Sequence, residues 1–258
     1  MIHHAGPPPF DCFEVLAARG VKHAVFTRLG GHSQGPFASL NVGHTVGDDP
    51  AHVEANHAAI YAALGVEAKQ VVCGRQVHSC RIVRVQAKDG GRVIGPADAL
   101  ITTERGLVLL QRYADCVPVL LAGPGIVGIA HAGWRGTLAR IAAKTAQVMA
   151  DVAHCPIEEI VVGIGPSIGP CCFEVGADVV SALRQALPQW ADDLIHTQDD
   201  GKVHLDLWEA NVAQLRAVGV REIEVAAVCT RCRRDLYFSH RGDGGHTGRF
   251  AALIMAGG

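Results

Sequence analysis

The sequence predicts a layered α/β fold, an α+β sandwich in which helices cover mixed β-sheets. Two observations favour this class. Short runs rich in valine, isoleucine and alanine alternate along the chain with longer segments whose apolar residues recur at helical spacing. The 258 residues are also 49% hydrophobic and only 19% charged, which suits one large globular domain or two small ones with a substantial core. Neither observation determines the order of the strands.

Eight segments are predicted to form strands. Each is short and rich in Val, Ile and Ala, as strands buried on one or both faces are. In chain order they are His23–Thr27, Arg81–Val85, Ala99–Thr102, Leu107–Leu110, Val117–Leu121, Ile126–Ala130, Ile160–Gly163 and Glu224–Cys229.

Four helices are predicted from capping residues or from apolar residues at helical spacing. Asp49 and Pro50 supply an N-cap and a first-turn proline, and Asp206 with Glu209 forms a capping box. Thr137 is expected to cap a helix with one apolar face. The expected limits of the four helices are Asp49 and Gly65, Thr137 and Met149, Ala177 and Leu187, and Asp206 and Gly219.

Composition disfavours several classes of function. The net charge is −2, no basic block stands out, and aromatic residues make up 5% of the chain, so a general nucleic-acid binder is not expected. The N-terminal sequence MIHHAGPPPFDCFEV lacks the pattern of a signal peptide, and no apolar run reaches the roughly 18 residues that span a bilayer. We therefore expect a cytoplasmic protein with no membrane partner, whose nine cysteines are reduced thiols.

The stretch YADCVPVLLAGPGIVGIAHAGWRG, residues 113–136, carries the strongest chemical signal. Cys116 and His131 each lie beside a short apolar run, and His78 lies upstream in GRQVHSC. One thiolate and two imidazoles favour zinc, and three protein ligands would leave a coordination position open, as in catalytic zinc sites. The alternative is that Cys116 is a small core residue and that both histidines are hydrogen-bonded loop residues.

Two segments are candidates for anion binding. The strand, glycine turn and helix of Ile126–Val148 could bind an anion at the helix N-terminus, with Arg135 as a clamp; alternatively Arg135 lies on the surface. The segment lacks GxGxxG and GxxxxGK[ST], which disfavours a dinucleotide or P-loop site. In FTRLGGHSQGPFASLNVG, Arg28, Ser39 and Asn41 could contact substrate hydroxyls or phosphate, or form an ordinary turn-rich loop.

Other polar and sulfur-bearing residues allow more than one interpretation. Asp115 could act as a general base, orient a ligand imidazole, or accept backbone hydrogen bonds in a turn. Cys229-x-x-Cys232 lacks a second CxxC, so a structural zinc knuckle is not expected. The adjacent Cys171 and Cys172 are poor disulfide partners, and all four cysteines are interpreted mainly as structural.

Taken together, the motifs resemble the laccase-domain family, also described as YfiH-type or multicopper polyphenol oxidase-like. The matching segments run in order from about residue 23 to 254: FTRLGGHSQGPFASLNVGHTVGDDP, RQVHS, ADALIT, YADCVPVLL, HAGWRG, GIGPSIGPCCFEV and CTRCRRDLYFSHRGDGGHTGR. The resemblance implies a single domain over residues 1–258 with a YfiH-type fold rather than a cupredoxin fold, and residues 1–20 as an N-terminal extension. It also implies zinc held by His78, Cys116 and His131.

The same resemblance implies a zinc-dependent purine nucleoside enzyme, both a transferase and a hydrolase. The expected reactions are phosphorolysis of adenosine, inosine, guanosine and methylthioadenosine, and deamination of adenosine. Asp115 is assigned proton transfer, and the substrate contacts are assigned to Arg28, Ser39, Asn41, Gln76 and Arg135. The partners are purine nucleosides and phosphate, and the chain is expected to be a monomer or homodimer.

The sequence leaves three alternatives to a purine nucleoside enzyme open. Some relatives are peptidoglycan-editing amidases that act on a nucleotide-linked muramyl-serine precursor. A laccase-like polyphenol oxidase needs a mononuclear copper and a trinuclear cluster, and the chain has no HxH pair, so copper is less expected than zinc. Finally, the metal could be structural if a fourth protein ligand closed its coordination shell.

Overall fold

Two β-sheets packed face to face organise residues 1–257, the part of the chain that the computed structural model describes. The larger sheet has seven strands in the order β1-β2-β3-β15-β8-β4-β6, and the smaller has six in the order β14-β11-β9-β10-β7-β5. The strands of the larger sheet are β1 (Ile2–His4), β2 (Phe10–Cys12), β3 (Lys22–Phe26), β15 (Phe250–Met255), β8 (Val108–Tyr113), β4 (Val71–Gly74) and β6 (Val93–Ile94). Those of the smaller sheet are β14 (Glu222–Val225), β11 (Val161–Ile164), β9 (Val117–Gly123), β10 (Ile126–Ala132), β7 (Ala99–Thr102) and β5 (Ile82–Arg84).

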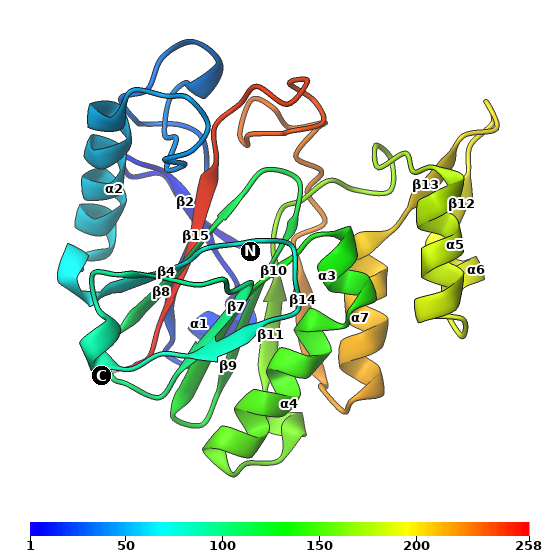
Figure 1. The fold of residues 1–258 in the computed structure, drawn as a ribbon. Coiled ribbons are helices and arrows are strands. Elements are labelled where there is room, and N and C mark those ends of the chain that lie inside the picture. The colour runs from blue at the N-terminus through cyan, green and yellow to red at the C-terminus, as the bar shows by residue number, and fades with distance from the viewer. Residues whose placement is uncertain (258) are drawn as a thin grey trace.

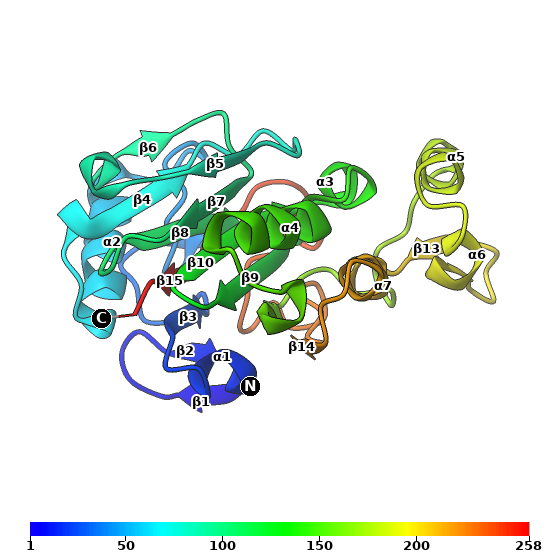
Figure 2. The same ribbon diagram turned by 90° about the horizontal axis from the view of Figure 1, so that it is seen from below.

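Helices cover the outer faces of both sheets, so the molecule has four layers (Figure 1, Figure 2). Ile60 of α2 packs with Leu110 and Leu253 on the larger sheet, and α4 and α7 share an apolar cluster with the smaller sheet. A lobe of α5, α6 and the hairpin β12–β13 projects to one side (Figure 1). The helices and this hairpin are α1 (Glu14–Ala17), α2 (Pro50–Leu64), α3 (Trp134–Leu138), α4 (Ile141–Ala153), α5 (Ala177–Ala186), α6 (Ala191–Leu194), α7 (Leu207–Ala217), β12 (Ile195–Thr197) and β13 (Val203–Leu205).

The core between the sheets explains the uninterrupted apolar runs of β9 and β10. Both strands are central in their sheet and covered on both faces, so every residue of β10 is buried. Residues 1–20 also contribute, because α1 buries Leu16 and the preceding Phe13 packs against Gly163 of β11. A Cβ at Gly163 would lie 2.3 Å from the Phe13 ring, so only glycine leaves room for this contact.

The predicted layered α/β class is confirmed, and each of the eight predicted strands overlaps an observed one. The last one is displaced, because β14 spans Glu222–Val225 rather than Glu224–Cys229. The Asp49 and Asp206 caps are confirmed, since their carboxylates accept from Ala51 N (2.9 Å) and Glu209 N (3.0 Å).

The predicted Thr137 cap is wrong. Thr137 lies inside the five-residue helix α3, and α4 begins only after Arg140, whose φ of 63° breaks the helix. The strands β1, β2, β4, β6, β12, β13 and β15 were not predicted from the sequence.

None of the helices within residues 1–257 combines the length and the hydrophobicity required to cross a membrane.

Candidate metal centre and cleft

Three elements bring His78, Cys116 and His131 together. His131 lies near the end of β10, and Cys116 immediately precedes β9, which pairs antiparallel with β10 in a register that places Val117 opposite Ala132. His78 comes from the loop between β4 and β5, with a φ of 59°. One potential ligand atom from each of the three side chains lies within 4.8 Å of the others. The predicted trio is therefore a compact cluster in the structure.

Asp98 organises this cluster, and the sequence analysis did not identify it. Its side chain is fully buried, and its Oδ1 accepts a hydrogen bond of 2.9 Å from His131 Nδ1. The same carboxylate accepts from the backbone N–H groups of residues 77, 78 and 79 and from the Ser79 hydroxyl at 2.7 Å. Asp98 thus holds both the loop that carries His78 and the ring of His131, leaving Nε2 of that ring to face the cluster.

The electrostatics of the cluster favour a thiolate. Burial raises the pKa of the Cys116 thiol, but the charges and hydrogen bonds of His131 and His78 outweigh it and lower that pKa to about 6. Burial lowers the pKa of His131, yet Cys116 and Asp98 raise it to about 9. Burial also raises the pKa of the Asp98 carboxyl, but hydrogen bonds from His131 and Ser79 hold it well below its usual range. The group therefore presents one thiolate, which is the form that binds metals.

Gly133 keeps the space beside the cluster open. A Cβ built on Gly133 would lie 3.0 Å from Cys116 Sγ and 3.0 Å from His78 Nδ1, although its φ of −66° is compatible with any residue. A side chain here would therefore crowd the ligand atoms rather than strain the backbone. One thiolate, two imidazoles and a glycine cradle together fit a borderline-soft ion such as zinc.

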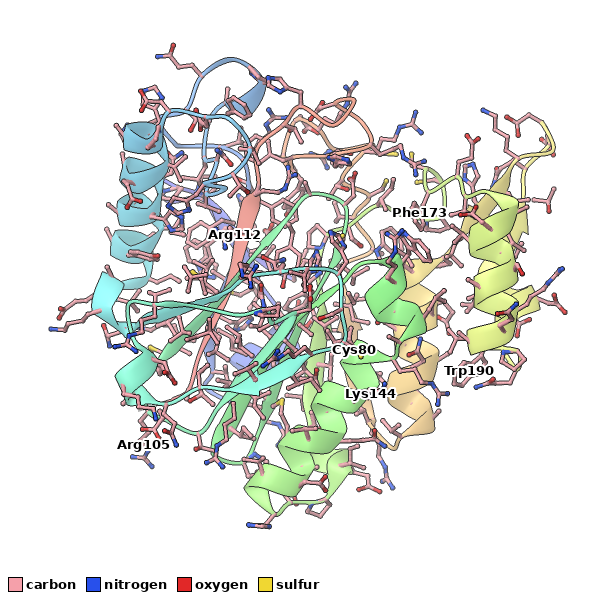
Figure 3. The ribbon with its side chains drawn as sticks, viewed as in Figure 1. Cys80, Arg105, Arg112, Lys144, Phe173 and Trp190 are labelled. Atoms are coloured by element: carbon pink, nitrogen blue, oxygen red, sulfur yellow. The ribbon has the colours of Figure 1, made fainter. Side chains whose placement is uncertain are left out.

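The cluster lies at the wall of a cleft of about 510 Å³. Four arginines line this cleft, whereas Asp115 is the only carboxylate among the lining residues of the described chain. Trp134, Ile168 and Phe173 supply apolar surface. Figure 3 shows Arg112 and Phe173 toward the same end of the molecule, opposite Arg105. The lining arginines are Arg75, Arg112, Arg241 and Arg249.

Asp115 lines the cleft, but its carboxylate is already engaged. It accepts hydrogen bonds from the hydroxyls of Thr230 and Ser239, both at 2.7 Å, and from the backbone N–H of Arg241 at 2.6 Å. Of the three interpretations of Asp115, the structure supports acceptance of hydrogen bonds at a turn, where its φ is 81°. The carboxylate that bonds to an imidazole of the trio is Asp98, through His131 Nδ1, and not Asp115.

Four of the five predicted substrate contacts do not line the cleft. Arg28 donates from Nε to the Ala38 carbonyl and lies over the Phe238 ring. The Ser39 hydroxyl donates to the Arg28 carbonyl, and Asn41 is fully buried and bonded to Asp48.

The remaining two residues differ from each other. Arg135 is exposed and stacks on Trp134, 4.2 Å from its centroid, and the anion site expected at this helix start is not supported because α3 has only five residues. Gln76 does line the cleft, but its amide exchanges hydrogen bonds with the backbone of Arg112.

Sequence reasoning missed the arginines because they come from three separate segments, of which the stretch between β14 and β15 supplies both Arg241 and Arg249. Arg112 directly precedes the YADC motif, and Arg249 ends the HTGR motif, so both lie within conspicuous sequence. Their arrangement arises only from strand pairing: β8 and β15 are antiparallel neighbours, and Phe250 pairs with Tyr113.

The chain is similar to known proteins over most of its length. The family model described as multi-copper polyphenol oxidoreductase laccase matches residues 22–257. The purine nucleoside phosphorylase YlmD of Geobacillus stearothermophilus is 40% identical over 260 residues, which cover 96% of this chain and 92% of that protein. Adenosine deaminase RL5, from an unidentified prokaryote, is 34% identical, with 90% and 93% covered.

A solved structure has the same fold. The hypothetical protein YfiH of Bacillus licheniformis superposes with a TM-score of 0.92 at 34% identity, covering 98% of both chains. The fold expected from the resemblance, mixed sheets rather than a cupredoxin, is thereby confirmed. The chain belongs to the multi-copper polyphenol oxidoreductase laccase family, in its YfiH-like form.

Proposed function

We propose that this protein is a zinc-dependent purine nucleoside enzyme that catalyses phosphorolysis of purine nucleosides and deamination of adenosine. The observation that carries the proposal is a cleft in which a His78–Cys116–His131 cluster lies beside four arginines. Relatives named purine nucleoside phosphorylase and adenosine deaminase, similar over most of the chain, support both activities.

The arginines account for the phosphate requirement. Guanidinium groups bind phosphate oxygens through charge-assisted, often bidentate hydrogen bonds. Arg249 is held by the carbonyls of Thr247 and Gly248, and Arg112 by that of Gly74, so both are oriented before an anion arrives. In phosphorolysis a phosphate oxygen attacks the ribose C1′, and the glycosidic bond electrons leave with the purine, which then takes up a proton. The positive charge of the four arginines outweighs the single carboxylate, Asp115, among the described lining residues, so the cleft concentrates the attacking anion.

The metal ligands provide for the second reaction. The Cys116 thiolate and the two imidazoles would hold zinc, and Asp98 keeps the His131 Nδ1 proton in place. When bound, zinc supplies Lewis acidity and makes water a stronger acid, as hydrolytic deamination at C6 of adenine requires. Trp134 and Phe173 supply apolar surface in the cleft for a purine ring. In this proposal Asp115 positions the segment that carries His240 and Arg241, and does not transfer the proton.

Of two other activities in the family, laccase chemistry is the less consistent with the site. A laccase needs several copper centres. The described residues 1–257 form two clusters of side chains that could bind a metal ion, this trio and a group of four cysteines. An amidase acting on a nucleotide-linked muramyl-serine would also use an anion-binding cleft, and is therefore tested directly alongside the nucleosides.

The proposal is tested by incubating the protein with adenosine, with and without phosphate, and separating the products by chromatography. Adenine should form only with phosphate, inosine should form in either case, and His131→Ala should abolish inosine formation. Exposed Arg105, outside the cleft, provides a matched control as Arg105→Ala. Oxygen uptake with phenols, or cleavage of the muramyl-serine amide without nucleoside turnover, would replace the proposal with the corresponding alternative.

A further inference from the structure

Four cysteines from two distant segments converge outside the trio. Cys171 and Cys172 lie in the loop after β11, and Cys229 and Cys232 lie in the loop after β14. All four Sγ atoms lie within 4.8 Å of one another. The sequence contains no second CxxC, but the structure supplies the second pair from the adjacent Cys171 and Cys172.

Backbone hydrogen bonds fix the two segments against each other. Ser167 and Cys229 form a parallel β-bridge, in which Ser167 N donates to the Val228 carbonyl at 3.2 Å and Thr230 N donates to the Ser167 carbonyl at 3.0 Å. The Trp208 indole N–H also donates to the Ser167 hydroxyl at 2.6 Å. The sulfur atoms are thus presented by an ordered scaffold and do not depend on an ion to approach one another.

The sulfur separations fit a tetrahedral ion better than a disulfide. Cys232 Sγ lies 3.7 Å from Cys171 Sγ and 3.5 Å from Cys172 Sγ. A Zn–S bond of about 2.3 Å implies sulfur–sulfur distances near 3.8 Å across a tetrahedron, whereas a disulfide bond is about 2.0 Å long. The backbone N–H of Gly169 points at Cys229 Sγ at 3.3 Å, a contact that stabilises a metal-bound thiolate.

The surroundings favour a negatively charged complex. Four thiolates around a divalent cation carry a net charge of −2, which needs nearby positive charge or solvent. Arg231 directly precedes Cys232 in the sequence CTRCRRD, whereas the guanidinium of Arg233, on the other side, is paired with Asp235. Cys171 and Cys232 are exposed, while Cys172 and Cys229 are buried, so one side of such a complex would be hydrated.

We propose that Cys171, Cys172, Cys229 and Cys232 bind one zinc ion in a closed four-thiolate site, separate from the His78–Cys116–His131 cluster. Four protein ligands leave no open coordination position, so this zinc is structural. The proposal does not depend on the enzymatic activity, because it rests on the sulfur geometry alone.

The site would fix two walls of the cleft. The loop after β11, which carries Cys171 and Cys172, also carries Ile168 and Phe173. The loop after β14, which carries Cys229 and Cys232, continues to His240 and Arg241. Thr230, next to Cys229, donates to Asp115, which in turn precedes Cys116. Zinc here would therefore hold the lining residues in place without contacting a substrate.

The first test counts metal in the full-length protein, purified under reducing conditions without chelator. Elemental analysis should give about two zinc ions per chain for the wild type, and about one for His131→Ala and for Cys232→Ser. Cys155→Ser is the matched control, because Cys155 belongs to neither group, and it should retain both ions. A single zinc in the wild type that disappears in His131→Ala, or iron in place of zinc, would overturn the proposal.

A second measurement needs no variant, in case Cys232→Ser does not fold. Cys171 and Cys232 are exposed, so an alkylating reagent can reach both sulfur atoms when they are free thiols. If zinc binds them, iodoacetamide labelling followed by mass spectrometry should show both protected until a strong chelator is added, whereas labelling of Cys155 should not change with chelator. Rapid labelling before chelation, or a disulfide linking two of the four cysteines, would contradict the proposal.

Discussion

Replacing Asp98 with asparagine should weaken metal binding although every metal ligand remains. Oδ1 of Asp98 accepts from His131 Nδ1 at 2.9 Å, and Oδ2 accepts from Ser79 N at 2.8 Å. An amide keeps one oxygen and presents an NH₂ group in place of the other. Whichever way it turns, one N–H faces another donor, so either the His131 ring or the His78-bearing loop loses its support.

The expected magnitude follows from those contacts. Losing one hydrogen bond to a charged acceptor costs about 1.5–3 kcal/mol. Loss of the group that orients a ligand histidine typically reduces metal affinity about 10- to 100-fold, which corresponds to roughly 1.4–2.7 kcal/mol. The two estimates agree, and we expect the zinc Kd of Asp98→Asn to rise by about 10- to 100-fold.

The assay is competition with a chromogenic chelator, following only the zinc ion that His131→Ala removes. Asp11→Asn is a suitable control, because the Asp11 carboxylate accepts a 2.7 Å hydrogen bond from Tyr237 but has no contact with the cluster. Near-ultraviolet circular dichroism would establish that each variant is folded. An unchanged Kd in a folded Asp98→Asn protein would refute the idea that this carboxylate sets the geometry of His131.

Three further predictions concern Gly133, Arg75 and His57. Gly133→Ala should raise the zinc Kd with little change in Tm, because the new Cβ would lie 3.0 Å from both Cys116 Sγ and His78 Nδ1. Arg75→Ala should raise the KM for phosphate about tenfold or more, the effect of losing one charge-assisted hydrogen bond, and leave deamination unchanged. Burial lowers the pKa of His57 to about 4, so the unfolded chain takes up its proton first as the pH falls below about 6.5. This histidine should therefore reduce the free energy of unfolding by about 2 kcal/mol between pH 7 and pH 5.

Each of these predictions has its own control. Gly6→Ala is the control for Gly133→Ala, because it places a Cβ in open space and should leave the zinc Kd unchanged. Arg105→Ala is the control for Arg75→Ala and should leave the KM for phosphate unchanged. Urea unfolding at both pH values compares wild type with His57→Asn, in which the predicted pH dependence should be reduced. An equal pH dependence of the free energy of unfolding in the two proteins would show that the pKa of His57 is the same in the folded and unfolded states, which would contradict the prediction. A Gly133→Ala protein with normal zinc affinity, or an equal rise in the KM for adenosine and phosphate in Arg75→Ala, would likewise contradict the site as described.

The clustering of His78, Cys116 and His131 could be predicted from the sequence because their side chains have distinctive chemistry. Cys116 and His131 end or precede apolar runs, and pairing of neighbouring strands necessarily brings such positions together. The clearest helix ends were equally local, since the Asp49 and Asp206 caps bond within their own first turn. By contrast, the sheet order required pairing between β15 and β8, more than 130 residues apart in the chain, which no local pattern encodes.

The two aspartates show the limit of local sequence reasoning. Asp115 is adjacent to a ligand in the chain, so it attracted a catalytic assignment, yet its carboxylate is bound to Thr230, Ser239 and the backbone of Arg241. Asp98 is 33 positions away from His131 but touches its ring, because β7 pairs with β10 and places Ala99 opposite Ala130. Proximity in sequence and proximity in space diverge most at the ends of paired strands, where this site lies.

The two sulfur-containing groups therefore differ in what their ligands permit. The trio has three protein ligands and a glycine cradle at a positive cleft, an arrangement that leaves room for a substrate. Four cysteine ligands would fill the coordination shell of the second ion and leave no position for a substrate. These cysteines also join the loops that carry Phe173 and Arg241. Because Thr230 links the second group to Asp115, and Asp115 precedes Cys116, loss of the four-thiolate site should disturb the cleft through this path. Cys232→Ser should then raise substrate KM while the trio retains its zinc, a separation that a single shared metal site would not produce.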